Sequence, residues 1–319
     1  MIMPANNRSY KVISLLIKTL ILIFSFCYIL QKINEANHSI NFYGLIGHSN
    51  KIYLLTACML VLANWGLEAL KWQLLISPLE PISYLTSVRS VFAGVTVSIF
   101  TPSRVGEFIG RIFFLERADK IQATLKSFTG SIIQLFITII GGVTAYFVLE
   151  IYFENFFQTK QFISSNSVLI LIFCFALLIS LVVFIYSKRN GRLIHYKKYI
   201  DTLTNHSPLE LLIISGLSLV RYLIFSFQYY LILKFFGVNA DSTILFSLIA
   251  LTFFVTSVIP TFSLTEIAVR GATAVYFFSA ISINTTAIVA SSLLLWIINL
   301  AIPALIGSVF VLNLKFVKD

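Results

Sequence analysis

Two short segments hold residue types that could bind or pair with an anion inside an apolar chain. The first is TPSRVGEFIGR, residues 101–111, and the second is IPTFSLTEIAVR, residues 259–270. Each has a proline, then a glutamate, then an arginine four positions later: Pro102, Glu107 and Arg111, and Pro260, Glu266 and Arg270. A proline ends the preceding helix, and residues four apart share one face of the next. The spacing therefore predicts a helix break followed by a Glu–Arg pair, twice.

The chemistry predicted for these breaks is anion recognition. The start of the helix after each break carries partial positive charge and free N–H groups, which Arg104 reinforces at the first break. A further cation, Arg221, lies within the apolar stretch SLVRYLIF and must face a cavity or a partner. We expect a polar path for an anionic headgroup, formed by Arg104, Glu107, Arg111, Arg221, Glu266 and Arg270. The alternative is that the Glu–Arg pairs only neutralise one another and fix the tips of the hairpins. Arg221 itself is expected either to bind phosphate or to pair with Glu266.

Other polar residues in apolar stretches are predicted to stabilise the structure rather than to bind a ligand. Glu68 and Lys71 are predicted to form an ion pair at the inner membrane boundary, with Trp65 and Trp72 as interfacial anchors. Gln134 and Gln228 are predicted to hydrogen-bond between helices.

Composition sets the class of protein to which these residues belong. The chain has 319 residues, of which 58% are hydrophobic and 11% charged, whereas a soluble domain carries about 25% charged residues. We therefore predict an all-α polytopic membrane protein. The net charge of +10 is assigned to loops that meet anionic lipid rather than to nucleic acid. The three cysteines have no metal-ligand spacing, and no catalytic arrangement is found, so no metal, no cofactor and no enzymatic activity are expected.

Apolar runs place the elements that must position the charged residues. Six runs are long enough to span a bilayer: 12–30, 52–76, 126–149, 168–187, 209–235 and 284–313. Two shorter runs, 90–100 and 243–259, stop just before Pro102 and Pro260 and are predicted to be re-entrant, broken helical hairpins. Two crossings in place of each hairpin would also close the topology, but with shorter spans. Of the 23 Lys and Arg, this topology puts 15 inside, three outside and five in membrane segments. It therefore predicts cytoplasmic N- and C-termini.

The order of the elements predicts one membrane domain, residues 1–319, built on an internal repeat. The first helix, 12–30, precedes repeat one at 52–149, and a linking helix at 168–187 leads to repeat two at 209–313. An odd number of crossings separates the repeats, so their hairpins are predicted to enter from opposite sides. This is the plan of inverted-repeat transporters.

These segments resemble a known family. TPSRVGEFIGRIFFLER, VIPTFSLTEIAVRGATAVYFF and WGLEALKWQLL are similar to the lysylphosphatidylglycerol synthase transmembrane-region family, over about residues 10 to 313. The resemblance implies a multi-pass protein of the bacterial inner membrane. In the best-known members this region moves aminoacylated phosphatidylglycerol between leaflets and precedes a soluble aminoacyltransferase domain. We expect no such domain here, because the sequence stops soon after the last apolar run. At both breaks, residues 103–105 and 262–265 replace the glycine-rich turns of other members.

Two functions follow as expectations. The first is a flippase or translocator of a lipid headgroup, with an anionic or aminoacylated phospholipid or a lipid-linked sugar as substrate. The alternative is a membrane partner of a separate glycosyltransferase or synthase, with no transport of its own. A wet cavity between the two breaks would favour the first function, and tight apolar packing there would favour the second.

Overall fold

The described part of the chain is entirely helical. A computed structural model describes residues 50–101, 104–152, 202–203, 206–259, 261, 263–282 and 284–312, and no strand occurs among them. The predicted spans 12–30 and 168–187 and the breaking residues Pro102 and Pro260 lie outside the described residues. The helices are α3 (Lys51–Ile76), α4 (Tyr84–Ile99), α5 (Gly106–Ile112), α6 (Lys120–Tyr152), α9 (Pro208–Phe235), α10 (Ser242–Val258), α11 (Ser263–Phe278), α12 (Thr285–Trp296), the π-helical turn η3 (Ile297–Ala301) and α13 (Ile302–Leu312).

Four stretches within the described residues are long and apolar enough to cross a membrane: 51–76, 120–152, 208–235 and 285–312. They coincide with four of the six predicted spans. Their starts are fixed by side-chain caps, which satisfy the free N–H groups of a helix's first turn. Asn50 accepts from Ile52 N, Asp119 from Ile121 N, Ser207 from Glu210 N, and Asn284 from Ala287 N.

A helical hairpin interrupts each half of the chain at the expected place. The helix α4 has 16 residues and α10 has 17, so each is about 25 Å long, less than the roughly 30 Å of a bilayer core. They end at Ile99 and Val258, directly before the predicted breaks. The helices α5 and α11 follow and pack against α4 and α10, respectively. The first hairpin is longer than predicted, because α4 begins at Tyr84 rather than at residue 90.

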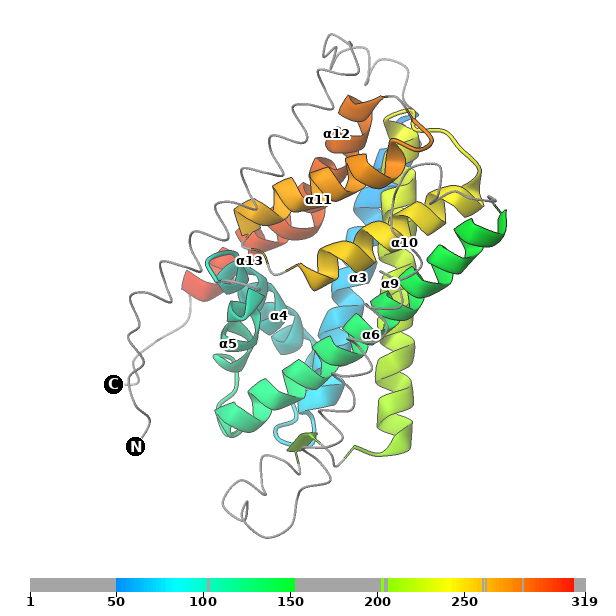
Figure 1. Cartoon of the computed structure of the whole chain (residues 1–319). Coiled ribbons are helices and arrows are strands. Elements are labelled where there is room, and N and C mark those ends of the chain that lie inside the picture. The colour runs from blue at the N-terminus through cyan, green and yellow to red at the C-terminus, as the bar shows by residue number, and fades with distance from the viewer. Residues whose placement is uncertain are drawn as a thin grey trace, which may run out of the picture.

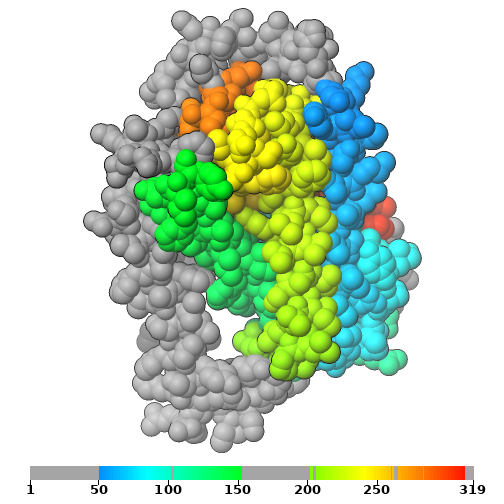
Figure 2. Space-filling view, turned by 90° about the vertical axis from the view of Figure 1, so that its right-hand side faces the viewer, coloured from blue at the N-terminus to red at the C-terminus, as the bar shows by residue number. Residues whose placement is uncertain are grey.

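The two halves interlock around a central helix pair. The helices α3 and α9 pack together, and both run along the length of the molecule (Figure 1), as the space-filling view shows for α3 in blue and α9 in yellow-green (Figure 2). The hairpin helix α4 packs against α13 of the other half, and α10 packs against α6. The last long helix of each half therefore packs against the hairpin of the other half.

Glycines allow these crossed contacts to be close. A Cβ added at Gly307 of α13 would lie 2.0 Å from the carbonyl oxygen of Phe92 in α4. A Cβ at Gly142 of α6 would lie 2.4 Å from Cβ of Phe254 in α10. Any larger residue would push the helices apart, so these positions fix how closely the halves approach.

A carboxylate in the turn after α3 ties the first hairpin to the start of α6. Glu80 accepts hydrogen bonds from three successive backbone N–H groups, those of Glu116, Arg117 and Ala118, at 3.1, 2.8 and 2.8 Å. The residues between α5 and α6 are thereby held against the end of α3.

Candidate functional site

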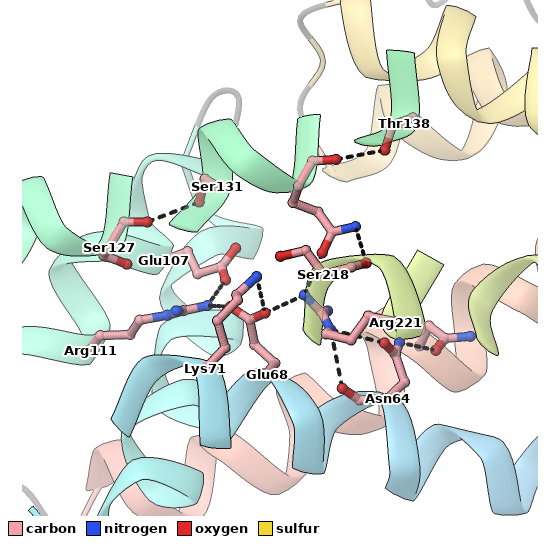
Figure 3. A network of polar contacts seen from close by, with 12 residues as sticks. Asn64, Glu68, Lys71, Glu107, Arg111, Ser127, Ser131, Thr138, Ser218 and Arg221 are labelled. Carbon is pink, nitrogen blue, oxygen red and sulfur yellow. Dashed lines mark hydrogen bonds and ion pairs between the residues drawn. The ribbon is translucent and has the colours of Figure 1, made fainter. Parts of the chain in front are cut away.

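Glu68 is the centre of a buried charge cluster between α3, α5 and α9 (Figure 3). One carboxylate oxygen lies 2.7 Å from Arg111, and the other lies 2.7 Å from Lys71 and also pairs with Arg221. Glu68 is 4% exposed and Lys71 is 2% exposed. The predicted Glu68–Lys71 pair is present, and it is buried inside the protein, because α5 and α9 each bring an arginine onto the same carboxylate.

Arg111 is held by the Glu107 pair that the spacing predicted. Its guanidinium pairs with both Glu107 and Glu68 and lies 5.7 Å from the centre of the Trp72 ring. Close helix approach brings it there: a Cβ at Gly110 of α5 would lie 2.6 Å from Cα of Gly94 in α4. Arg111 is 2% exposed, and its positive charge is compensated by these two carboxylates inside the protein.

Arg221 lies among polar side chains that come from three different helices. The alternative that it pairs with Glu266 was wrong; it pairs with Glu68 instead. Its Nε donates to Asn64 Oδ1 at 3.1 Å, and Nη1 donates to Gln134 Oε1 at 3.3 Å. This network joins α3, α6 and α9 at the centre of the described residues.

The amide network extends to the last long helix. Asn64 donates to Asn299 at 3.4 Å, and Asn299 donates to Gln228 at 3.0 Å. Gln228 donates to the carbonyl of Ala57 at 2.7 Å, and Gln134 donates to the carbonyl of Ser218 at 3.2 Å. The predicted interhelical hydrogen bonds of Gln134 and Gln228 are thus confirmed.

A second charge cluster joins the two hairpins directly. Arg104, next to the first break, donates to both carboxylate oxygens of Glu266 at 2.8–3.2 Å. Arg270 Nε donates to the same carboxylate at 2.8 Å, which confirms the predicted pairing four residues apart. Arg104 has φ of +56°, the one non-glycine residue with positive φ in the described part of the chain. Left-handed backbone is unfavourable for a residue with a Cβ, so the ion pairs hold Arg104 in a strained conformation.

A threonine just past the end of the first hairpin's longer helix supports the start of the next helix. Thr101 Oγ1 accepts from Gly106 N at 2.7 Å, and a Cβ at Gly106 would lie 2.6 Å from that oxygen. Thr101 therefore supports the start of α5.

A cavity of about 230 Å³ lies between the two charge clusters. Three of the predicted site residues line it, namely Arg104, Arg221 and Arg270, and they come from both hairpins and from α9. Glu107, Arg111 and Glu266 are not among the lining residues. The neutral polar lining consists of Asn64, Gln134, Thr138, Thr256, Ser257 and Asn299. Aromatic rings complete the wall, chiefly Trp65, Tyr222, Phe225, Phe253 and Trp296.

The charges around the cavity do not balance. The two clusters contain five cations and three carboxylates: Lys71, Arg104, Arg111, Arg221 and Arg270 against Glu68, Glu107 and Glu266. No carboxylate is found among the described residues that line the cavity. Within the described part of the chain, the two clusters therefore carry two net positive charges in a place of low dielectric, where an anion is attracted more strongly than in water. No group of three or more His, Cys, Asp or Glu suited to a metal occurs within the described residues.

Comparison with known proteins identifies the family of the chain. The sequence matches the family described as Lysylphosphatidylglycerol synthase TM region over residues 11–307. The chain belongs to this family. No curated protein and no solved structure matches it. Together with its long apolar helices, membership of the lysylphosphatidylglycerol synthase TM region family makes the chain a multi-pass integral membrane protein.

Within this family member, sequence reasoning missed the residues that organise the site. Glu68 was assigned to the membrane boundary, and Asn64, Thr101 and Asn299 were not considered. The signal for Glu68 was present: a carboxylate inside a 26-residue apolar helix has to meet cations from elsewhere. No sequence pattern indicated Asn299, which η3 places beside Asn64. A π-helical turn inserts one residue and redirects side chains, and such turns are frequent at functional sites.

Proposed function

We propose that this protein is a translocator of lipid headgroups in the bacterial inner membrane. The observation that carries the proposal is the cavity between the two hairpins, whose described lining includes three arginines and no carboxylate. Arginine is the side chain best suited to bind phosphate, because its planar group donates two hydrogen bonds at once. A phosphate headgroup entering the cavity would meet guanidinium groups from both halves of the chain.

The size of the cavity supports a headgroup as cargo rather than a whole lipid. At about 230 Å³ it lies below the roughly 300–1,000 Å³ of pockets that enclose drug-sized ligands. The acyl chains would stay in the bilayer while the headgroup passes through the protein. Exposed apolar side chains on the long helices, such as Leu62, Ile140 and Leu212, provide a surface for those chains.

We propose further that the two halves form an inverted repeat with cytoplasmic termini. The packing supports this: exchanging α3 with α9, α4 with α10, and α6 with α12–α13 turns the contacts of one half into those of the other. Asn64 and Arg221 each lie 13 residues after the start of their helices, α3 and α9, and they bond to each other. Alternating access by rocking of such repeats around a shared central site is the transport mechanism known for this plan.

Arg270→Gln tests the proposal, with Lys234→Gln as the matched control. Arg270 lines the cavity, and Glu266 keeps Arg104 as a partner when Arg270 is replaced. Lys234 lies at the end of α9 beside Asn239, away from the cavity. In proteoliposomes, Arg270→Gln should slow leaflet exchange of a fluorescent phosphatidylglycerol about 10- to 100-fold, the value of a lost charge-assisted hydrogen bond. The control should exchange lipid at the wild-type rate.

Exchange at equal rates in the wild type, Arg270→Gln and protein-free vesicles would contradict the proposal. The result would favour the other expected function, a membrane partner of a separate glycosyltransferase or synthase. Purification of such an enzyme together with this chain would then be the next measurement.

A further inference from the structure

The hydrogen-bonding groups of the cavity are unequally divided between donors and acceptors. Each of its three amide side chains already uses its oxygen inside the protein. Asn64 Oδ1 and Gln134 Oε1 accept from Arg221, and Asn299 Oδ1 accepts from Asn64. The strongest neutral acceptors of the lining are therefore not available to a ligand that donates hydrogen bonds.

The nearby carboxylates are also engaged. Both oxygens of Glu266 accept from Arg104, and one also accepts from Arg270. Both oxygens of Glu68 meet cations, and its side chain is 5% exposed. A ligand ammonium group entering the cavity would find no carboxylate among the described residues that line it.

Donors, in contrast, are left over. Within the described residues, Arg270 uses only Nε for Glu266, so its two terminal nitrogens carry no protein partner. Arg270 lines the cavity, so these nitrogens can donate to a ligand that is rich in acceptors, such as a phosphate.

Hydroxyl groups in the cavity lining can accept hydrogen bonds from a ligand. Thr138, Thr256 and Ser257 each donate to a backbone carbonyl of their own helix, at 3.0, 2.8 and 2.7 Å. Their oxygens therefore keep lone pairs for a ligand hydroxyl. The cavity thus combines cationic donors with weak acceptors, a pattern that suits a phosphate carrying hydroxyl groups.

We infer that the cavity selects a net-anionic, hydroxyl-bearing phosphate headgroup, such as phosphoglycerol, and rejects the same headgroup once it carries an aminoacyl ammonium group. This inference rests on the proposed translocator function and names its substrate class. The ammonium would meet two uncompensated positive charges. The aromatic rings of the wall offer it only a cation–π contact, which is weaker than a charge pair.

Fluorescence of the cavity tryptophans tests the charge selection by binding alone. The chain has three tryptophans, and two of them line the cavity. The purified full chain in detergent would be titrated with dihexanoyl phosphatidylglycerol, its lysyl ester and dihexanoyl phosphatidylcholine. Phosphatidylglycerol should bind at least about tenfold more tightly than either of the others. Equal affinity, or tighter binding of the lysyl ester, would overturn the inference.

A single added carboxylate should change the selection. Gln134→Glu keeps the shape of the side chain and places a negative charge beside Arg221, so the preference for phosphatidylglycerol over its lysyl ester should fall about tenfold. Asn239→Asp is the control, because it adds a carboxylate near Lys234, outside the cavity. Its preference should equal that of the wild type. A preference that Gln134→Glu leaves unchanged would overturn the role of the cavity charges.

The two proposals fail in different ways. Selective binding without leaflet exchange would overturn translocation and leave the charge selection intact. Leaflet exchange that proceeds equally with phosphatidylglycerol and its lysyl ester would overturn the charge selection alone.

Discussion

Glu68→Gln should destabilise this protein more than any other single neutralisation in the two charge clusters. Glu68 is buried and serves three cations at once, from α3, α5 and α9. Removing one partner of a buried ion pair costs about 3–5 kcal/mol, because the other charge is left uncompensated. Three cations would lose their shared partner here, and only Arg111 would keep another carboxylate, Glu107.

The measurement is the midpoint of thermal unfolding in detergent. One kcal/mol corresponds to about 2–4 °C for a domain of 150–250 residues, so Glu68→Gln should lower the midpoint by at least about 6 °C. Glu107→Gln is the matched control. Its side chain is 22% exposed and its partner Arg111 keeps Glu68, so its midpoint should fall by only about 2–4 °C.

A second substitution shows whether stranded charge or altered packing causes the loss of stability in Glu68→Gln. Adding Lys71→Met to Glu68→Gln removes one of the stranded cations and should recover part of the lost stability. The reasoning is refuted if Glu68→Gln unfolds within about 2 °C of the wild type, or if the Glu107→Gln control falls as far. Failure of the double variant to recover would show that packing, not charge, sets the cost.

Two further predictions concern helix packing and pH. Gly307→Ala should cost about 1–3 kcal/mol, because its Cβ would meet a backbone carbonyl of α4, whereas Gly216→Ala, with open space around it, should be neutral or stabilising in the same unfolding assay. Partial burial raises the pKa of the Glu80 carboxyl, but hydrogen bonds from the N–H groups of residues 116–118 outweigh it and hold the pKa below its ordinary value. Glu80 therefore adds stability above a pH of about 4.3, and this contribution is lost as the pH falls through the lowered pKa. The difference in unfolding midpoint between wild type and Glu80→Gln should shrink from pH 7 to pH 3.5, and a constant difference would contradict this account.

Much of the fold followed from local sequence features. The long apolar runs gave four described helices close to their predicted bounds, because about 20 apolar residues in succession have few other stable states in a bilayer. The spacing of Glu107 and Arg111, and of Glu266 and Arg270, gave two ion pairs, because residues four apart share a helix face. The predicted spans 12–30 and 168–187 stay predictions.

The candidate site was predicted only in part. The sequence indicated the three arginines of the cavity as charges that needed a polar environment. It did not indicate which carboxylate each would meet. Arg221 pairs with Glu68, 153 positions away, and Arg104 pairs with Glu266, 162 positions away. Such pairings depend on how whole helices pack, which local spacing does not encode.

What the sequence determined alone is the class of molecule, a helical membrane protein broken twice by Pro…Glu-x-x-x-Arg segments. The cost of exposing backbone or charge to lipid fixes that much. Only the tertiary structure decided how the charges are shared. Because α3, α5 and α9 converge on Glu68 and the two hairpins meet at Glu266, these carboxylates are paired within the protein, and Arg104, Arg221 and Arg270 line the cavity.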